Sequence, residues 1–88
     1  MSADKWLELG DSLLEELRYT EAEAAFREAI DLEPRRHSGW NGLGRSLLGQ
    51  DLSSQAVESF RKAVRCDPTD HAAWYNLGIS LMEQGNNE

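Results

Sequence analysis

The residues with the chemistry of a catalytic centre are Cys66, a thiol nucleophile, and His37 and His71, two candidate general bases. Neither histidine has a cysteine at the short spacing that a zinc site uses. No glycine-rich loop joins a strand to a helix, and no serine, histidine and aspartate stand in a supporting context. The sequence therefore predicts no enzyme, no cofactor and no metal site. We expect the histidines to be exposed at helix entries and Cys66 to be a small buried hydrophobic residue.

Acidic side chains are the other group whose spacing could serve a function. Asp4, Glu8, Asp11 and Glu15 follow one another at steps of three and four residues, which places them on one face of a helix. A row of carboxylates of this kind could bind a basic segment of another protein. The alternative is that the row is only the solvated face of a surface helix, which charge runs usually are.

The charge of the whole chain restricts its partners. The 88 residues carry a formal net charge of −7, whereas nucleic acids and anionic membranes attract basic surfaces. We therefore expect no nucleic-acid and no membrane partner. No apolar run has the length of a membrane span, the first residues lack the features of a signal peptide, and one cysteine fits a reducing compartment. These observations favour a cytoplasmic protein.

The sequence repeats itself with a fixed period. Trp6, Trp40 and Trp74 are spaced by 34 residues, and so are several other sets. Those sets are Leu9, Leu43 and Leu77; Gly10, Gly44 and Gly78; Leu13, Leu47 and Leu81; Ala22 and Ala56; Phe26 and Phe60; Ala29 and Ala63; Pro34 and Pro68. A period of this length indicates a stacked repeat array.

Each period contains two runs of apolar residues at helical spacing. They predict helices over about 6–17, 22–32 and 38–49, a fourth that ends before Pro68 and a fifth that carries Trp74. We expect Thr20 and Glu23 to form a capping box, and Ser54 and Asp70 to cap the fourth and fifth helices. The fold class is thus all-α, with about five antiparallel helices in a single domain over 1–88.

The three glycines that follow the 34-residue period, Gly10, Gly44 and Gly78, lie in the middle of helices. Glycine costs about 1 kcal/mol relative to alanine at such positions. A repeated cost at one position indicates a packing need. We expect each of these glycines to form a notch that receives the phenylalanine of the next helix, together with Ala22 in the first period and Ala56 in the second.

These residues resemble the tetratricopeptide repeat (TPR) family, whose signature has this period. The match is Trp6-Leu9-Gly10, Ala22-Phe26, Ala29 and Pro34, again Trp40-Leu43-Gly44, Ala56-Phe60, Ala63 and Pro68, and a third start at Trp74-Leu77-Gly78. Leu13, Leu47 and Leu81 stand where the family often has tyrosine. The resemblance implies repeats over 3–36 and 37–70, a half repeat or capping helix over 71–88, and stacking into a right-handed superhelix.

The resemblance also implies a scaffold that binds a peptide or protein segment in the concave groove of its first helices. The groove residues carried over by position are Leu7, Glu8, Asp11, Glu15, Asn41, Arg45, Leu48, Tyr75, Asn76 and Ile79. A basic or mixed-charge segment would suit this mixture. Capture of a chaperone tail by a carboxylate clamp is not expected, because the clamp positions hold no cation: they are Leu7, Asp11, Gly42, Ala72 and Asn76.

Two alternatives concern the end of the sequence. The fifth helix keeps an apolar face with no helix after it, which favours self-association through this helix, and TPR arrays also occur as parts of larger enzymes or of secretion and assembly factors. We expect a turn at Gly85, with 86–88 leading into a further helix of a longer array. The alternative is that the fifth helix is a natural cap.

Overall fold

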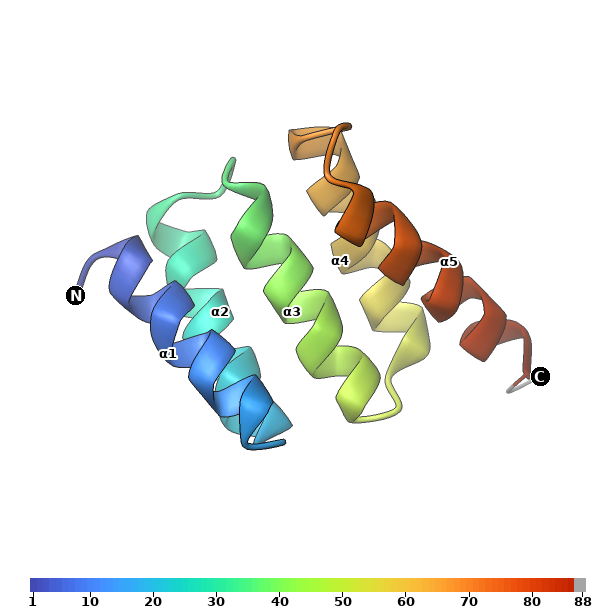
Figure 1. The fold of residues 1–88 in the computed structure, drawn as a ribbon, viewed down its shortest axis with the longest axis horizontal. Helices are drawn as coiled ribbons and strands as arrows, with labels where there is room; N and C mark the ends of the chain where they lie inside the picture. The colour runs from blue at the N-terminus through green and yellow to red at the C-terminus, as the bar shows by residue number, and fades with distance from the viewer. Residues whose placement is uncertain (87–88) are drawn as a thin grey trace.

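The computed structural model describes residues 1–86 and contains five α-helices within them. Consecutive helices run in opposite directions and pack side by side (Figure 1). The helices are α1 (Ala3–Glu15), α2 (Tyr19–Leu32), α3 (His37–Gly49), α4 (Ser53–Cys66) and α5 (His71–Asn86). The all-α prediction is confirmed for this part of the chain. None of the described helices combines the length and the apolar character needed to cross a membrane.

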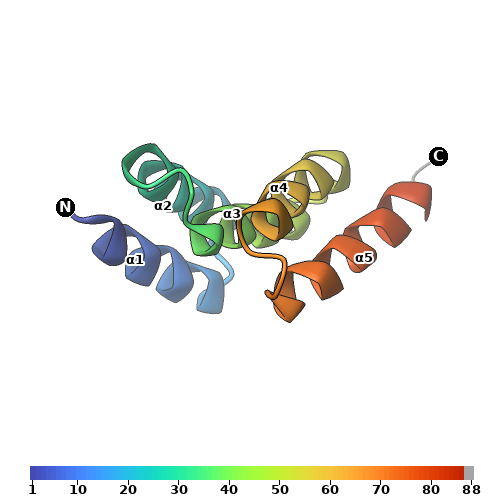
Figure 2. The same cartoon turned by 90° about the horizontal axis from the view of Figure 1, so that it is seen from above.

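The helices form two layers. Figure 2 shows α1, α3 and α5 along one side of the array and α2 and α4 on the other. Neighbouring helices of the first layer touch, α1 with α3 and α3 with α5. The row of α1, α3 and α5 is curved, and the side of the row that faces away from α2 and α4 is concave (Figure 2). The first helix of each repeat therefore lines one continuous face, and the right-handed superhelical twist stays a prediction.

The core confirms the glycine notches in the two repeats. A Cβ atom on Gly10 would lie 2.6 Å from the Phe26 ring, and one on Gly44 would lie 2.6 Å from the Phe60 ring. Both rings are fully buried. Phe26 also touches Gly42, a contact between the repeats that the 34-residue period does not predict. Glycine thus lets α3 approach the aromatic rings on both of its sides.

Two of the predicted helix caps are wrong. The second helix begins at Tyr19, before Thr20, and the fourth begins at Ser53, before Ser54, and neither start has a side-chain cap. The backbone makes the turn instead. Leu17 and Asp51 adopt left-handed conformations with φ of 60° and 62°, and the following N–H groups return to the ends of α1 and α3, at 2.9 Å in both turns.

The cap on the fifth helix is confirmed. Asp70 Oδ1 accepts a hydrogen bond from the Ala73 N–H at 3.1 Å, which satisfies one of the free donors at the start of α5. The turn expected at Gly85 is wrong, because α5 continues through Gly85 to Asn86. Gly85 is the equivalent of Asp51, but no glycine in the described part has a positive φ. The expectation for the last two residues lies outside the described part.

Candidate functional site

A polar hollow of about 260 Å³ lies on the concave face, where α1 and α3 meet and the turn before α5 approaches them. Its walls hold charges of both signs and several side-chain hydrogen-bonding groups. The lining residues are Asp11, His37, Ser38, Asn41, Gly42, Arg45 and Asp70. Asp11, Asn41 and Arg45 are among the groove residues carried over from the sequence, and the structure brings them together.

Asp11 and Arg45 give the hollow its electrostatic character. Partial burial raises the pKa of the Asp11 carboxyl, the Arg45 guanidinium acts in the opposite direction, and the Glu15 carboxylate raises it further. The net shift is upward. Arg45 is exposed and donates no hydrogen bond within residues 1–86. A carboxylate and a guanidinium of facing helices are thus both accessible to a third, bound group.

Two asparagines continue the concave face from α3 to α5. The Asn76 side-chain amide donates to Asn41 Oδ1 at 3.4 Å, a long hydrogen bond. The Asn76 backbone carbonyl accepts from Ser80 Oγ at 2.8 Å. Because each asparagine amide carries a donor and an acceptor, this pair keeps free hydrogen-bonding capacity. Such groups can pair with the backbone of an extended segment.

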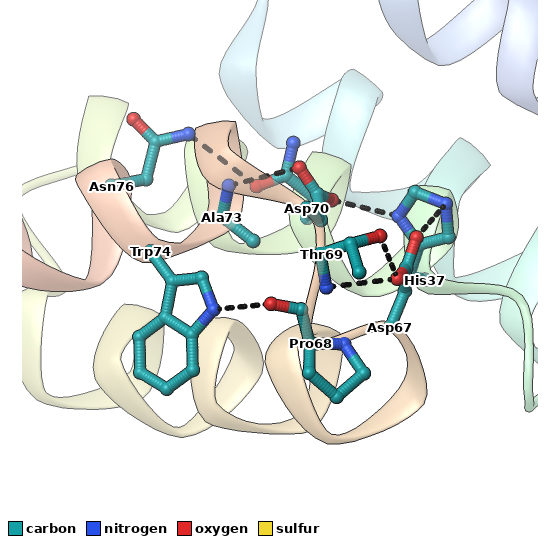
Figure 3. Close-up of polar contacts among 9 residues, drawn as sticks. His37, Asp67, Pro68, Thr69, Asp70, Ala73, Trp74 and Asn76 are labelled. Carbon is teal, nitrogen blue, oxygen red and sulfur yellow. Dashed lines mark hydrogen bonds and ion pairs between the residues drawn. The ribbon is translucent and has the colours of Figure 1, made fainter.

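His37 joins the start of α3 to the turn before α5, as Figure 3 shows. Its Nδ1 lies 2.7 Å from Asp70 Oδ2, and its Nε2 lies 3.5 Å from Asp67 Oδ2. The Thr69 hydroxyl and N–H donate to Asp67 and, with His37, lower the pKa of that carboxyl. His37 lies at a helix entry, as expected, but it is only partly exposed. Both of its nitrogens face carboxylates, so it also links the two repeats.

The remaining groove candidates lie in varied surroundings. Leu7 belongs to the hydrophobic core, with 8% of its surface exposed, and Leu48 packs against that core. Leu7 therefore offers little surface to a partner. Glu8, Glu15 and Tyr75 are exposed, and Ile79 is half-buried. His37 and Asp70 were missed as members of the hollow. Their separation of 33 residues, one less than the repeat, was the available signal.

Part of the acidic row on α1 is paired. Asp4 Oδ1 lies 2.6 Å from Arg36 Nη1, and Glu8 lies 3.9 Å from Lys5. Glu15 makes no ion pair with any residue in 1–86. The carboxylates nearest the hollow, Asp11 and Glu15, are therefore those with the most capacity for a new partner.

The thiol of Cys66 is exposed at the last residue of α4. The expectation that it is buried is wrong. The equivalent residue of the first repeat, Leu32, is also exposed, so this position faces solvent in both repeats. Hydrophobic character at one position was a poor guide because both residues lie at the end of a helix.

The arrangement of paired helices agrees with comparisons to known proteins. Two family models, both described as tetratricopeptide repeat, match residues 7–71 and 59–88. No curated protein matches the chain. The first model alone spans most of the sequence, and the second covers α5 and much of α4. The chain therefore belongs to the tetratricopeptide repeat family.

Proposed function

We propose that this protein binds a segment of a partner protein along its concave face and catalyses no reaction. Tetratricopeptide repeats are generally protein–protein interaction modules. The observation that carries the proposal is the polar hollow, where Asp11 and Arg45 face each other beside Asn41. Charges of both signs beside amide groups can fix the direction and register of a bound segment.

The charges on this face favour a basic or mixed-charge segment. Asp11 and Glu15 would attract a lysine or an arginine, while Arg45 would attract a single carboxylate. A partner's terminal carboxylate is a poor fit for the clamp positions, because Leu7 is buried and Asp11 is acidic. Tyr75 and Ile79 on α5 supply the apolar surface that an anchoring side chain needs.

A displayed library of random peptides would test this proposal. Peptides selected on the wild-type protein should shift the backbone amide signals of Asn41, Arg45 and Asn76 in NMR titrations. For selected peptides that carry a carboxylate, Arg45→Glu should weaken binding by about tenfold or more, because the carboxylate loses its partner in the hollow and meets a like charge. Arg61→Glu makes the same change on the exposed side of α4 and serves as the control.

Two results would contradict the concave-face proposal. One is that signal shifts are confined to α2 and α4. The other is that Arg45→Glu and Arg61→Glu weaken binding of these peptides equally, which would mean that the peptide carboxylate is not bound at the hollow.

We propose self-association through α5 as a second candidate function. Trp74, Tyr75, Leu81 and Met82 of this helix are exposed, and a Cβ atom on Gly78 would meet no atom within 4 Å, unlike one on Gly10 or Gly44. Such a face could pack on the same face of a second copy. Sedimentation equilibrium should show a dimer that Met82→Lys dissociates. A monomer at high protein concentration would exclude this candidate.

The exposed thiol supports a cytoplasmic setting. A free cysteine at the surface persists where the compartment is reducing. A thiol-reactive label applied to fractionated cells should modify Cys66 in the cytoplasmic fraction. Recovery of the protein in an oxidised, disulfide-linked form would contradict this assignment.

A further inference from the structure

A second hollow lies between α1 and α2, on the side of α1 opposite the acidic row. It has a volume of about 480 Å³, and its lining combines apolar side chains with Arg18, Glu21 and Glu28. Arg18 is paired with Glu16 and Glu21, which leaves Glu28 as the unpaired charge of this hollow within residues 1–86. The residues that matter here are Trp6, Leu9, Leu13, Glu21, Ala25 and Glu28. It is separate from the concave hollow, so an inference about it does not depend on the proposed function.

The second repeat contains the equivalent hollow, between α3 and α4. Its lining includes the residues that follow those of the first hollow by 34 positions: Trp40, Leu43, Leu47, Gln55, Ser59 and Lys62. Arg27 of α2 also lines it, and its volume is smaller, about 210 Å³. In the second repeat, therefore, the preceding helix supplies a basic side chain to this hollow.

Trp40 makes two contacts at the second hollow. The Lys62 ammonium lies 4.5 Å from the centre of the Trp40 ring, a cation–π contact. The Trp40 indole N–H donates to the Pro34 carbonyl at 2.8 Å. The tryptophan thus receives a cation on its face and a backbone acceptor at its edge.

The first hollow lacks both contacts. Glu28 stands where the second repeat has Lys62, so this hollow is lined by a carboxylate at the position where the second hollow has an ammonium group. Glu28 has no hydrogen-bond or ion-pair partner within residues 1–86, and the Trp6 indole N–H has no acceptor there. Leu9 is 40% exposed, whereas its equivalent Leu43 is 2% exposed.

We propose that the hollow between α1 and α2 binds an arginine or lysine side chain of a basic segment of a partner protein. The methylene groups pack on Leu9 and Leu13, the charged group lies over the Trp6 ring, and Glu28 accepts its hydrogen bonds. A backbone carbonyl of the same segment accepts the Trp6 indole N–H. In the second repeat the corresponding groups are the Lys62 ammonium over the Trp40 ring and the Pro34 carbonyl at its indole N–H.

The indole N–H signals of the three tryptophans allow a direct test by NMR. The probe is the capped peptide Gly-Arg-Leu-Arg-Gly, and the matched control is Gly-Gln-Leu-Gln-Gly. The arginine peptide should shift the Trp6 signal and leave the signals of Trp40 and Trp74, which already donate to prolyl carbonyls, almost unchanged. Raising the salt concentration should weaken the effect, because part of the attraction is between charges.

Three variants test whether Glu28 binds the basic side chain. Glu28→Gln removes the charge and should weaken binding about threefold or more. Glu28→Lys places an amine where the second repeat has Lys62, and should abolish the Trp6 shift. Glu58→Gln removes the same charge from the second hollow and should leave the Trp6 shift unchanged.

Four results of these titrations would overturn the inference. An equal Trp6 shift with the glutamine peptide would mean that the hollow selects apolar contact alone. A shift that survives Glu28→Lys, or shifts confined to the concave amides of Asn41 and Arg45, would place the arginine elsewhere. The absence of any Trp6 shift while the wild-type spectrum remains that of a folded protein would also exclude the site.

Discussion

The first helix of each repeat has one face that can pack against the helix that follows it in the chain. This face of α1 packs on α2 and that of α3 packs on α4, whereas no helix follows α5 among the described residues. In the two repeats this face is covered by the following helix, so that Leu47 is 2% exposed. Leu81 is its equivalent on α5 and is 42% exposed. The same residue type at the same place in the repeat is a core residue in one copy and a surface residue in the other. Burial here is decided by the neighbouring helix.

The largest effect expected from this comparison is that of shortening the two leucines. Leu47→Ala should lower the free energy of unfolding by about 2–5 kcal/mol, because it leaves a cavity between α3 and α4. Leu81→Ala should lower it by less than about 1 kcal/mol, because solvent already reaches that side chain. Urea denaturation followed by circular dichroism measures both. Equal losses would show that the face of α5 is covered in solution, as self-association would require.

The glycines should respond in opposite directions. Gly44→Ala forces a methyl group to within 2.6 Å of the buried Phe60 ring and should cost about 1–3 kcal/mol of stability. Gly78→Ala meets no atom within 4 Å and should stabilise α5 by about 0.5–1 kcal/mol, because alanine favours the helix.

Thermal unfolding of the two alanine variants beside the wild type provides the measurement. The comparison fails if Gly78→Ala is as destabilising as Gly44→Ala. That result would mean that another helix fills the notch at Gly78.

The sequence was sufficient to predict the helices, their pairing and the two glycine notches, since all of them depend on residues at a fixed period. It was insufficient at the turns, where Leu17 adopts a left-handed conformation that leucine rarely takes, and Asp51 adopts the same conformation in the second repeat. There the backbone hydrogen bonds of the turn outweigh the local preference, and Thr20 and Ser54 are not needed as caps.

The candidate site was predicted only in part, for a related reason. Asp11, Asn41 and Arg45 follow from their positions in the repeat, because each points away from the paired helix. Leu7 is instead part of the hydrophobic core, with 8% of its surface exposed. The contact of His37 with Asp70 crosses from one repeat to the next, and such contacts depend on the angle between repeats, which the period alone does not fix.

A smaller effect is expected at the tryptophans. Trp40→Phe removes the hydrogen bond to Pro34 and weakens the contact with Lys62, and should cost about 1–2 kcal/mol. Trp74→Phe removes only the equivalent bond to Pro68, at a residue that is 49% exposed, and should cost about 0.5–1 kcal/mol. Equilibrium unfolding of both variants measures the difference. A larger loss for Trp74→Phe would mean that its exposed ring is in contact with another molecule.

The smallest effect is expected from a comparison of two hydrogen bonds between successive repeats, one to a charged group and one to a neutral group. Gln50, the residue after α3, donates to Glu23 of α2 at 2.8 Å. This bond, with that from Arg27, lowers the pKa of the Glu23 carboxyl below its ordinary 4.5. Because the pKa is lower in the folded protein, the stabilisation is complete above pH 4.5 and is lost as the pH falls through the folded-state value. The corresponding contact of α4 and α5 joins Ser54 and Gln84, which do not titrate in this range.

Glu23→Gln should therefore be less stable than the wild type at neutral pH, by less than about 1 kcal/mol, and the difference should shrink as the solution is acidified below pH 4.5. Ser54→Ala should show a difference from the wild type that does not change with pH. Urea denaturation of the three proteins over this pH range tests both statements. A constant difference for Glu23→Gln would show that the hydrogen bond from Gln50 contributes equally to the protonated carboxyl. In that case the negative charge of Glu23 would add nothing to the stability of this contact.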